Sequence, residues 1–239
     1  MENKFTAEKK YTFEELLDIV EKLRMPGGCP WDREQTHESI KHNIIEEGYE
    51  LIEAIESGDA EKIADESGDL LLQVVFHAQI AKESGEYEVS DCISKVCEKL
   101  IHRHPHVFGD ETAENAEAVL EKWNKIKRDD RGQDTVSKEM DGVSKMLPSL
   151  MRAHKVQKKA EKNGYIFQDA AIVGENVSGM LKALDENSDK QTAEKYIGKI
   201  LFELVSAANK LDIEPELALS KHIDLFIKEY EKFETVKGN

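Results

Sequence analysis

The segment from Ile63 to Ile80 constrains the fold more than any other part of the sequence. Its apolar residues recur at helical spacing along two separate stripes. One stripe holds Ile63, Leu70, Leu71, Val74, Val75 and Ala78, and the other holds Leu72, Phe76 and Ile80. A helix that is apolar on two sides is buried on two sides. The segment therefore predicts a helix at the centre of an all-α protein, with partners on both sides.

Two carboxylates interrupt the apolar pattern of this helix. Glu66 and Asp69 are three residues apart, which places them on one helix face, along the stripe of Phe76 and Ile80. We therefore expect at least Asp69 to be shielded from water. The sequence from Ile63 to Ala81 contains no Lys or Arg, so a buried carboxylate there needs a proton or a metal ion as its partner.

A second acidic pair, Glu47 and Glu50, lies on a predicted helix from about Ser39 to Ser57. The break at Gly58-Asp59 is short enough to fold the two helices into an antiparallel hairpin. All four carboxylates would then converge on one spot. A single pair of this spacing is ordinarily a solvated helix face, because Asp and Glu make up 49 of the 239 residues.

A site of carboxylates without His or Cys has consequences for the metal it would take. Hard oxygen ligands favour Mg²⁺, with Mn²⁺ as a substitute, over Zn²⁺. Mg²⁺ that keeps open coordination positions typically meets phosphate groups. The chemistry indicated is phosphoryl or nucleotidyl transfer to water.

Several motifs surround the acidic pairs. They are Gly28-Cys29-Pro30-Trp31-Asp32 with Glu34-Gln35-Thr36, the E-E-x-x-E pattern from Glu46 to Glu50, Glu66 to Asp69 followed by Leu70-Leu71, Arg103-His104-Pro105-His106-Val107-Phe108, and Leu147-Pro148-Ser149-Leu150-Met151-Arg152-Ala153. Taken together and in this order, they resemble the MazG family of nucleoside triphosphate pyrophosphohydrolases.

The resemblance implies an all-α homodimer that uses Mg²⁺ to cleave the α–β phosphoanhydride of nucleoside triphosphates, giving a nucleoside monophosphate and pyrophosphate. Carried over residue by residue, it implies Glu47, Glu50, Glu66 and Asp69 as metal ligands. Glu46, next to the first ligand, is a candidate to orient or deprotonate the attacking water.

Four further residues are candidates for binding the substrate, each with a simpler alternative. Trp31 is either a wall against the nucleotide base or a packed loop anchor. Arg103 either neutralises the triphosphate or forms an ordinary salt bridge. Trp123 and Lys127 form a Trp-x-x-x-Lys pattern similar to that of the family, in which Trp123 also suits an apolar helix face and Lys127 a solvated one.

The histidines between His102 and His106 raise the hypothesis of a zinc site. Alternating His beside Pro105 does not place the ligands on one helix face, and no Cys or second His cluster completes a tetrahedron. We therefore do not expect zinc here.

Composition excludes some classes of partner. A net charge of −16 argues against sequence-independent binding to nucleic acid or to an anionic membrane. The sequence has no apolar run near the roughly 20 residues of a membrane span and no signal-peptide core at Met1. Its three cysteines lack metal-type spacing and fit a reducing compartment, so we expect a cytoplasmic protein.

The chain divides into three parts. We predict a catalytic domain at 1–130, a polar linker at 131–147 and a second repeat at 148–239. Capping signals at Thr12 with Glu15, and at Ser90, mark two helix starts in the first part. Gly68 to Val75 resembles Gly198 to Val205 at an offset of 198 − 68 = 130. We interpret the two copies as duplicated helical-hairpin modules that form four-helix-bundle-like domains completed by dimerisation.

The second copy lacks the acidic residues of the first. Glu47, Glu50, Glu66 and Asp69 align with Asn176, Gly179, Tyr196 and Lys199. We therefore expect the second copy to bind no catalytic metal and to serve as packing or dimerisation surface. The alternative function for the whole chain is a non-catalytic nucleotide-sensing or regulatory module. The loss of the acidic residues from the second copy favours that alternative, whereas the complete acidic set in the first copy opposes it.

Overall fold

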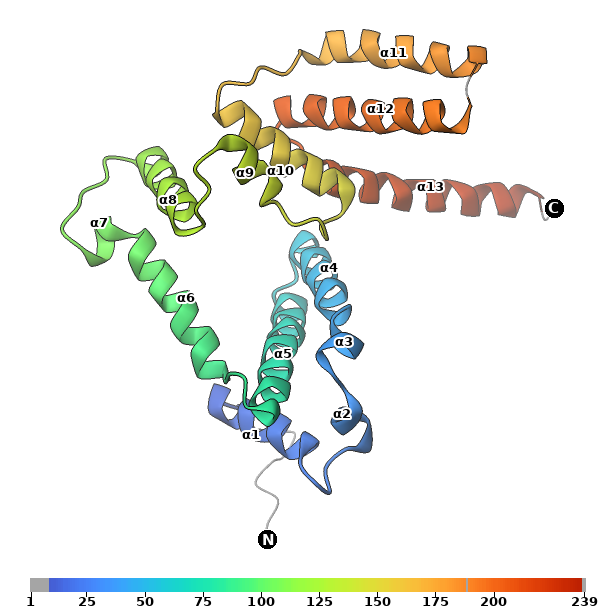
Figure 1. Ribbon diagram of the computed structural model, residues 1–239. Coiled ribbons are helices and arrows are strands. Elements are labelled where there is room, and N and C mark those ends of the chain that lie inside the picture. Colours follow the sequence, from blue (N-terminus) through green and yellow to red (C-terminus); the bar gives the residue numbers. More distant parts are fainter. Residues whose placement is uncertain (1–8, 188, 238–239) are drawn as a thin grey trace. The chain divides into compact units, whose positions relative to one another are not determined.

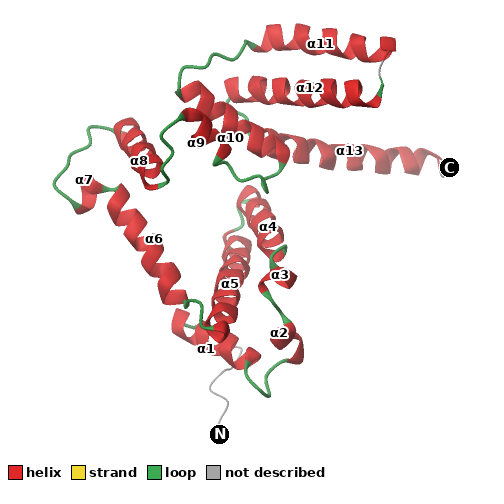
Figure 2. Ribbon diagram, viewed as in Figure 1, coloured by secondary structure: helices red, strands yellow, loops and turns green. Residues whose placement is uncertain are grey.

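The computed structural model describes residues 9–187 and 189–237, and within them every regular element is an α-helix (Figures 1 and 2). The predicted all-α class is confirmed. The chain separates into two compact units, one up to Glu114 and one from Asn115 onward.

The first unit contains a central hairpin with shorter helices around it. Its helices are α1 (Phe13–Arg24), α2 (Pro30–Glu34), α3 (His37–Ile40), α4 (Asn43–Ser57), α5 (Ala60–Ser84), α6 (Val89–Arg103) and α7 (Pro105–Phe108). Helices α1, α3, α4 and α6 all pack against α5, which makes the segment recognised in the sequence the centre of this unit.

The turn between α4 and α5 confirms the predicted hairpin. Gly58 ends α4 in the left-handed conformation, with φ of 70°, which glycine adopts without a Cβ penalty. Asp59 then caps α5, because its side chain accepts hydrogen bonds from the backbone N–H groups of Glu61 and Lys62 at 3.0 and 3.4 Å. The two helices run side by side along their length (Figure 1).

The core of the first unit lies around the second half of α5, where Val75, Phe76, Ala78 and Ala81 are buried. Val75 and Phe76 pack with Val20 of α1 and Ile40 of α3, and all four are buried. Both predicted stripes contribute buried residues, Val75 and Ala78 from one and Phe76 from the other, whereas Val74 is 49 % exposed. Burial of α5 on two sides is therefore confirmed for its second half, and the stripe that holds Val74 is only partly covered in the single chain.

Some predicted helix limits need correction. The segment from Ser39 to Ser57 is two helices, because the chain turns at Lys41 and His42 between α3 and α4. Thr12 with Glu15 forms the predicted capping box. Ser90 does not cap α6; Glu88 occupies the N-cap position and exchanges hydrogen bonds with Asp91, which fills the same role.

The second unit has a similar plan. Its helices are α8 (Ala116–Asp130), α9 (Val136–Asp141), α10 (Ser149–Lys162), α11 (Ala170–Asn187), α12 (Lys190–Lys210) and α13 (Pro215–Lys237). Helix α9 lies within the segment that we predicted as a linker. It forms because Thr135 caps it and because buried Glu139 pairs with Lys159 and Arg128.

The two hairpins, α4 with α5 and α11 with α12, correspond at the predicted offset. Asp189 caps α12 as Asp59 caps α5, and 189 − 59 = 130. Val75 and Val205 are each only 1 % exposed, and 205 − 75 = 130. The duplication and the exact domain limits stay predictions, and the structure places the division between compact units before α8 rather than after it.

Candidate metal centre

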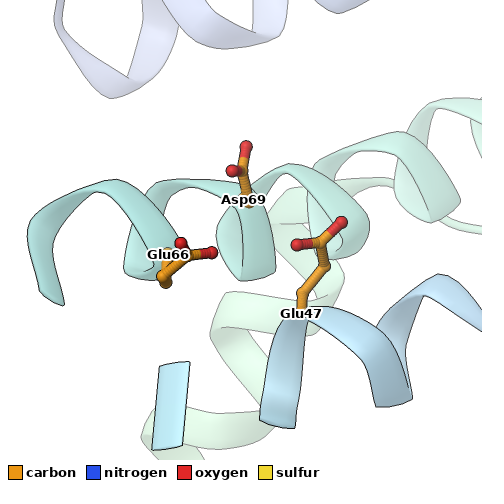
Figure 3. Close-up of side chains that lie close together, drawn as sticks. All are labelled: Glu47, Glu66 and Asp69. Atoms are coloured by element: carbon orange, nitrogen blue, oxygen red, sulfur yellow. The ribbon is translucent and has the colours of Figure 1, made fainter. Parts of the chain in front are cut away.

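Three carboxylates of the first unit form a cluster. Glu47, Glu66 and Asp69 each offer one oxygen atom, and these three atoms all lie within 4.8 Å of one another. Figure 3 shows Glu47 reaching from α4 toward Glu66 and Asp69 on α5. The hairpin therefore brings together acids from both predicted pairs, a spacing that suits ligands of one divalent cation.

The local sequence explains why these side chains meet. Glu66 and Asp69 are three residues apart on α5 and share a face. Gln73 lies one turn beyond Asp69 on α5. Its side-chain amide donates a hydrogen bond to Glu47 Oε1 at 3.4 Å. Gln73 is itself buried, so it fixes the approach of α4 to the acidic face of α5.

Charge repulsion is strong in this cluster. Partial burial, followed by the charges of Asp69, Glu50 and Glu46, raises the pKa of Glu47 above its ordinary value. Burial likewise raises the pKa of Glu66, together with neighbouring carboxylates and a hydrogen bond to Glu50. The oxygen-only donors of this cluster fit Mg²⁺ or Mn²⁺, whose positive charge would offset the repulsion among the carboxylates.

Glu50 and Glu46 lie at the edge of the cluster. Glu50 is exposed, and its charge and its hydrogen bond to Glu66 both raise the pKa of Glu66. Glu46 is also exposed and acts on Glu47 by its charge. Their roles as fourth metal ligand and as water-orienting group stay predictions.

The burial expected for Asp69 is wrong for the single chain. Asp69 is exposed, whereas Glu47 and Glu66 are half-buried. The physical reason is the uncovered side of α5, where the nearby Leu71 is 41 % exposed. The cluster therefore opens toward solvent on the Asp69 side.

The predicted substrate residues lie in several elements. Trp31, on α2, is 63 % exposed, so its interpretation as a packed loop anchor is wrong. Arg103 is half-buried at the end of α6. Trp123 and Lys127 are half-buried on α8 of the second unit, and their place in the site stays a prediction.

The equivalents of the four acids in the second copy form no comparable group. Asn176 donates to Gln168 Oε1 at 3.0 Å, and Lys199 is exposed. Among the described residues, the three-carboxylate cluster of the first unit is the arrangement of His, Cys, Asp and Glu that suits a metal ion. That arrangement does not include His102, His104 or His106, and the expected absence of zinc there stays a prediction.

Comparison with known proteins places the chain in a family. A model of the MazG nucleotide pyrophosphohydrolase domain matches residues 35–108, which include the whole cluster. A protein of Thermotoga maritima named nucleoside triphosphate pyrophosphohydrolase/pyrophosphatase MazG is 42 % identical over 222 residues, or 93 % of this chain and 85 % of that protein. The chain belongs to the MazG family.

Two other relatives of this MazG-family chain extend the comparison. The nucleoside triphosphate pyrophosphohydrolase of Escherichia coli K12 is 37 % identical over 230 residues, covering 92 % of this chain and 86 % of that protein. The uncharacterized protein YabN of Bacillus subtilis is 40 % identical over 228 residues, covering 94 % of this chain and 46 % of YabN. The similarity to each relative thus covers nearly the whole of this MazG-family chain.

Two further observations bear on where the protein works. In the part of the chain that the structure describes, no helix is both long enough and apolar enough to span a membrane. Cys29, Cys92 and Cys97 are all free thiols.

Mg²⁺ is expected to stabilise this MazG-family protein against heat. A cation that binds only the folded cluster at 100 times its dissociation constant adds about 2.7 kcal/mol. The effect should be larger at pH 8 than at pH 5, because acid protonates carboxylates whose pKa is raised. Thermal unfolding with Mg²⁺ and with chelator measures it.

The Glu66→Gln variant is the control for this stabilisation. It should melt at a similar temperature with and without Mg²⁺, and without metal it should be at least as stable as the natural protein, because one repelling charge is gone. An equal Mg²⁺ shift in the variant would contradict binding at this cluster.

Proposed function

We propose that this protein is a Mg²⁺-dependent nucleoside triphosphate pyrophosphohydrolase. The observation that carries the proposal is the cluster of Glu47, Glu66 and Asp69, which lies inside the region matched by the MazG domain. Relatives that are named for this activity, aligned over most of their length, support it. Glu50 is proposed as the fourth ligand.

The proposed reaction transfers the α-phosphoryl group to water. The water oxygen attacks the α-phosphorus, and the bond from that phosphorus to the α–β bridging oxygen breaks. Pyrophosphate leaves with that oxygen, and the nucleoside monophosphate keeps the oxygen from water. When bound, Mg²⁺ supplies charge neutralisation of the phosphates and lowers the pKa of a coordinated water.

The protein's own groups orient the water and receive its proton. Glu46 is proposed for this role because it is exposed beside Glu47 and its charge acts on that ligand. A positioned carboxylate is one of the side chains that commonly accept the proton of an attacking water.

The nucleotide itself needs contacts that the carboxylates do not supply. Trp31 is proposed as a stacking surface for the base, since its side chain is 63 % exposed. Arg103, Trp123 and Lys127 are proposed as the remaining substrate contacts, with the two cations placed against the triphosphate. The acidic chain as a whole makes such local cations necessary.

A homodimer is proposed as the working assembly. Large apolar side chains of the helices around the cluster face solvent in the single chain, including Ile45 of α4 at 57 % and Val74 of α5 at 49 %. A second copy that covers these faces would also shield Asp69 from water. The free thiols accord with the proposed location in the reducing cytoplasm.

Product analysis tests the proposed function. The purified protein is incubated with each common ribo- and deoxyribonucleoside triphosphate, with Mg²⁺ or with chelator, and the products are separated by anion exchange. Monophosphate and pyrophosphate should appear in equal amounts, and only with metal. Triphosphates that bind but stay intact would instead favour the nucleotide-sensing module, which the loss of the acids from the second unit supports.

A further inference from the structure

A pair of histidines connects two parts of the first unit. One is the segment from Pro30 to Thr36, which consists of α2 and the turn after it and is called the Trp31 loop below. The other is α5, the helix that carries Glu66 and Asp69. His77 lies on α5, two turns beyond Asp69 and one turn beyond Gln73. Its Nδ1 atom is 2.7 Å from Nδ1 of His37, the first residue of α3. The two ring planes are nearly parallel, with centroids 5.0 Å apart and an angle of 4° between the planes, so the rings face each other edge to edge as a hydrogen bond between them requires.

The contact between the two Nδ1 atoms needs one proton between them. A hydrogen bond between two Nδ1 atoms requires that one ring donates and the other accepts. The Nε2 atom of His77 is buried and has no hydrogen-bond partner. A buried N–H without an acceptor is rarer and costlier than a bare acceptor nitrogen, so the proton of His77 belongs on Nδ1. His77 then donates to His37.

In this arrangement an additional proton has no favourable position. On Nδ1 of His37 it would face the N–H of His77 at hydrogen-bond distance. On Nε2 of His77 it would create a buried cation without a partner. Burial, followed by the charge of His37, lowers the pKa of His77, which agrees with this reasoning.

Helix α3 transmits the position of His37 to the Trp31 loop. Ser39, on the same short helix, donates from Oγ to Gln35 Oε1 at 2.7 Å. The Gln35 amide in turn donates to the carbonyl oxygen of Trp31 at 2.9 Å. The hydrogen bond of His37 to α5 and the two hydrogen bonds from Ser39 to Trp31 are thus connected through the backbone of α3. Ile40, buried in the core, holds the other end of α3.

Charged groups on the elements that pack against α5 have partners of their own. Glu21 pairs with Lys82, Arg24 with Glu83, Lys9 with Glu15 and Glu38 with Lys41, whereas Glu47 accepts from Gln73 and Asp91 accepts from the backbone of Glu88. Besides burial, the charge of His37 acts on His77 and lowers its pKa.

We propose that His37 and His77 are positioning residues for nucleotide binding, joined by a hydrogen bond that tightens the packing of the Trp31 loop on the catalytic helix while Nδ1 of His37 carries no proton. This role rests on the proposed function, since Trp31 is the proposed contact for the base. A proton on Nδ1 of His37 removes the acceptor of this bond and loosens the loop. The pair thereby makes the KM for nucleotide depend on pH without touching the reacting atoms.

Kinetics of two variants test the pair. His37→Ala should raise KM about fivefold at pH 8 with little change in kcat, the size of one ordinary hydrogen bond. His37→Asn places an amide oxygen near the position of Nδ1 and does not titrate. It should keep a KM close to the natural value at pH 8, and its KM should rise less than that of the natural protein as the pH is lowered from 8 to 5.

Each comparison is made between proteins at the same pH, so that protonation of the nucleotide cancels. An unchanged KM in His37→Ala at pH 8 would overturn the proposal. So would a KM in His37→Asn that follows the pH exactly as in the natural protein. Absence of pyrophosphate from the natural protein at pH 8 would instead count against the proposed function.

A fluorescence measurement tests the loop without any turnover. In a Trp123→Phe background, Trp31 is the remaining tryptophan, since the chain has two. Its emission should change as the pH falls through the histidine range, and the added His37→Asn substitution should remove that change. The same pH transition in both proteins would show that the histidine pair does not control the loop.

Discussion

Replacing Glu47 by glutamine is expected to lower kcat/KM for nucleoside triphosphate hydrolysis at least about 100-fold, which corresponds to about 2.7 kcal/mol of lost transition-state stabilisation. The change removes one negative charge from the cluster while keeping the shape of the side chain. The amide of Gln73 can still contact the remaining oxygen. Steady-state pyrophosphate release measures the loss, and circular dichroism checks that the helices persist.

A matched control lies on the same helix. Glu53 is exposed on α4 and is not among the charges that raise the pKa of Glu47 or Glu66. Glu53→Gln should therefore keep kcat/KM within about twofold, as expected for a surface substitution remote from the site. Near-natural kcat/KM in Glu47→Gln, or an equal loss in the control, would remove Glu47 from the proposed centre. Glu50→Gln should also lose turnover if Glu50 is the fourth ligand.

The second large effect concerns Arg24, whose side chain is only 5 % exposed. Its guanidinium donates to both carboxylate oxygens of Glu83 at 2.8 Å and to the carbonyl oxygens of Asp32 and Gln35. It also lies over the ring of Phe76, with 5.2 Å to the centroid. The Arg24 side chain thus joins three parts of the first unit: α1, the Trp31 loop and α5.

Arg24→Ala is expected to destabilise the first unit by about 2–4 kcal/mol. Breaking a fully buried ion pair costs about 3–5 kcal/mol, and we take a lower range because Glu83 is 38 % exposed and regains water. Urea unfolding followed by Trp31 fluorescence in the Trp123→Phe background reports on this unit. Lys82→Ala is the control, because Lys82 and Glu21 form a surface pair worth at most about 1 kcal/mol.

The effect of Arg24 should depend on pH in a defined direction. The hydrogen bond from Arg24 holds the pKa of Glu83 below its ordinary value. The stabilisation is therefore present above the unfolded pKa of about 4.5 and is lost as the pH falls through the lower folded value. The difference between Arg24→Ala and the natural protein should shrink in acid. A constant difference, or one no larger than that of Lys82→Ala, would contradict this account.

Periodicity predicted the central elements well, because it depends on local backbone geometry. The apolar spacing along α5, the break at Gly58-Asp59 and the cap at Thr12 each determine a helix or its end from neighbouring residues alone. The split between α3 and α4 was missed because the intervening residues carry no Gly or Pro. The short helix α9 was missed because its buried Glu139 is stabilised by Lys159 and Arg128, which are distant in the sequence.

The candidate cluster was predictable because three-residue spacing on adjacent helices is a local property, and the E-x-x-E and E-x-x-D patterns of the family include its residues. Other functional groups gave weaker signals. Gln73 could have been found from its place one turn after Asp69 on the same face of α5. The contact between His37 and His77 had no sequence signal, since the two residues are 40 positions apart and each alone is ordinary.

By itself the sequence determined that the chain is all-helical, that two acidic pairs face each other across one hairpin, and that its motifs are those of the MazG family. Each of these follows from local spacing or from motif order. Only the tertiary structure decided that Asp69 is open to solvent, that Arg24 joins the Trp31 loop to α5, and that His37 contacts His77. These facts depend on which surfaces are covered and which distant side chains meet, and the packing of whole helices sets both.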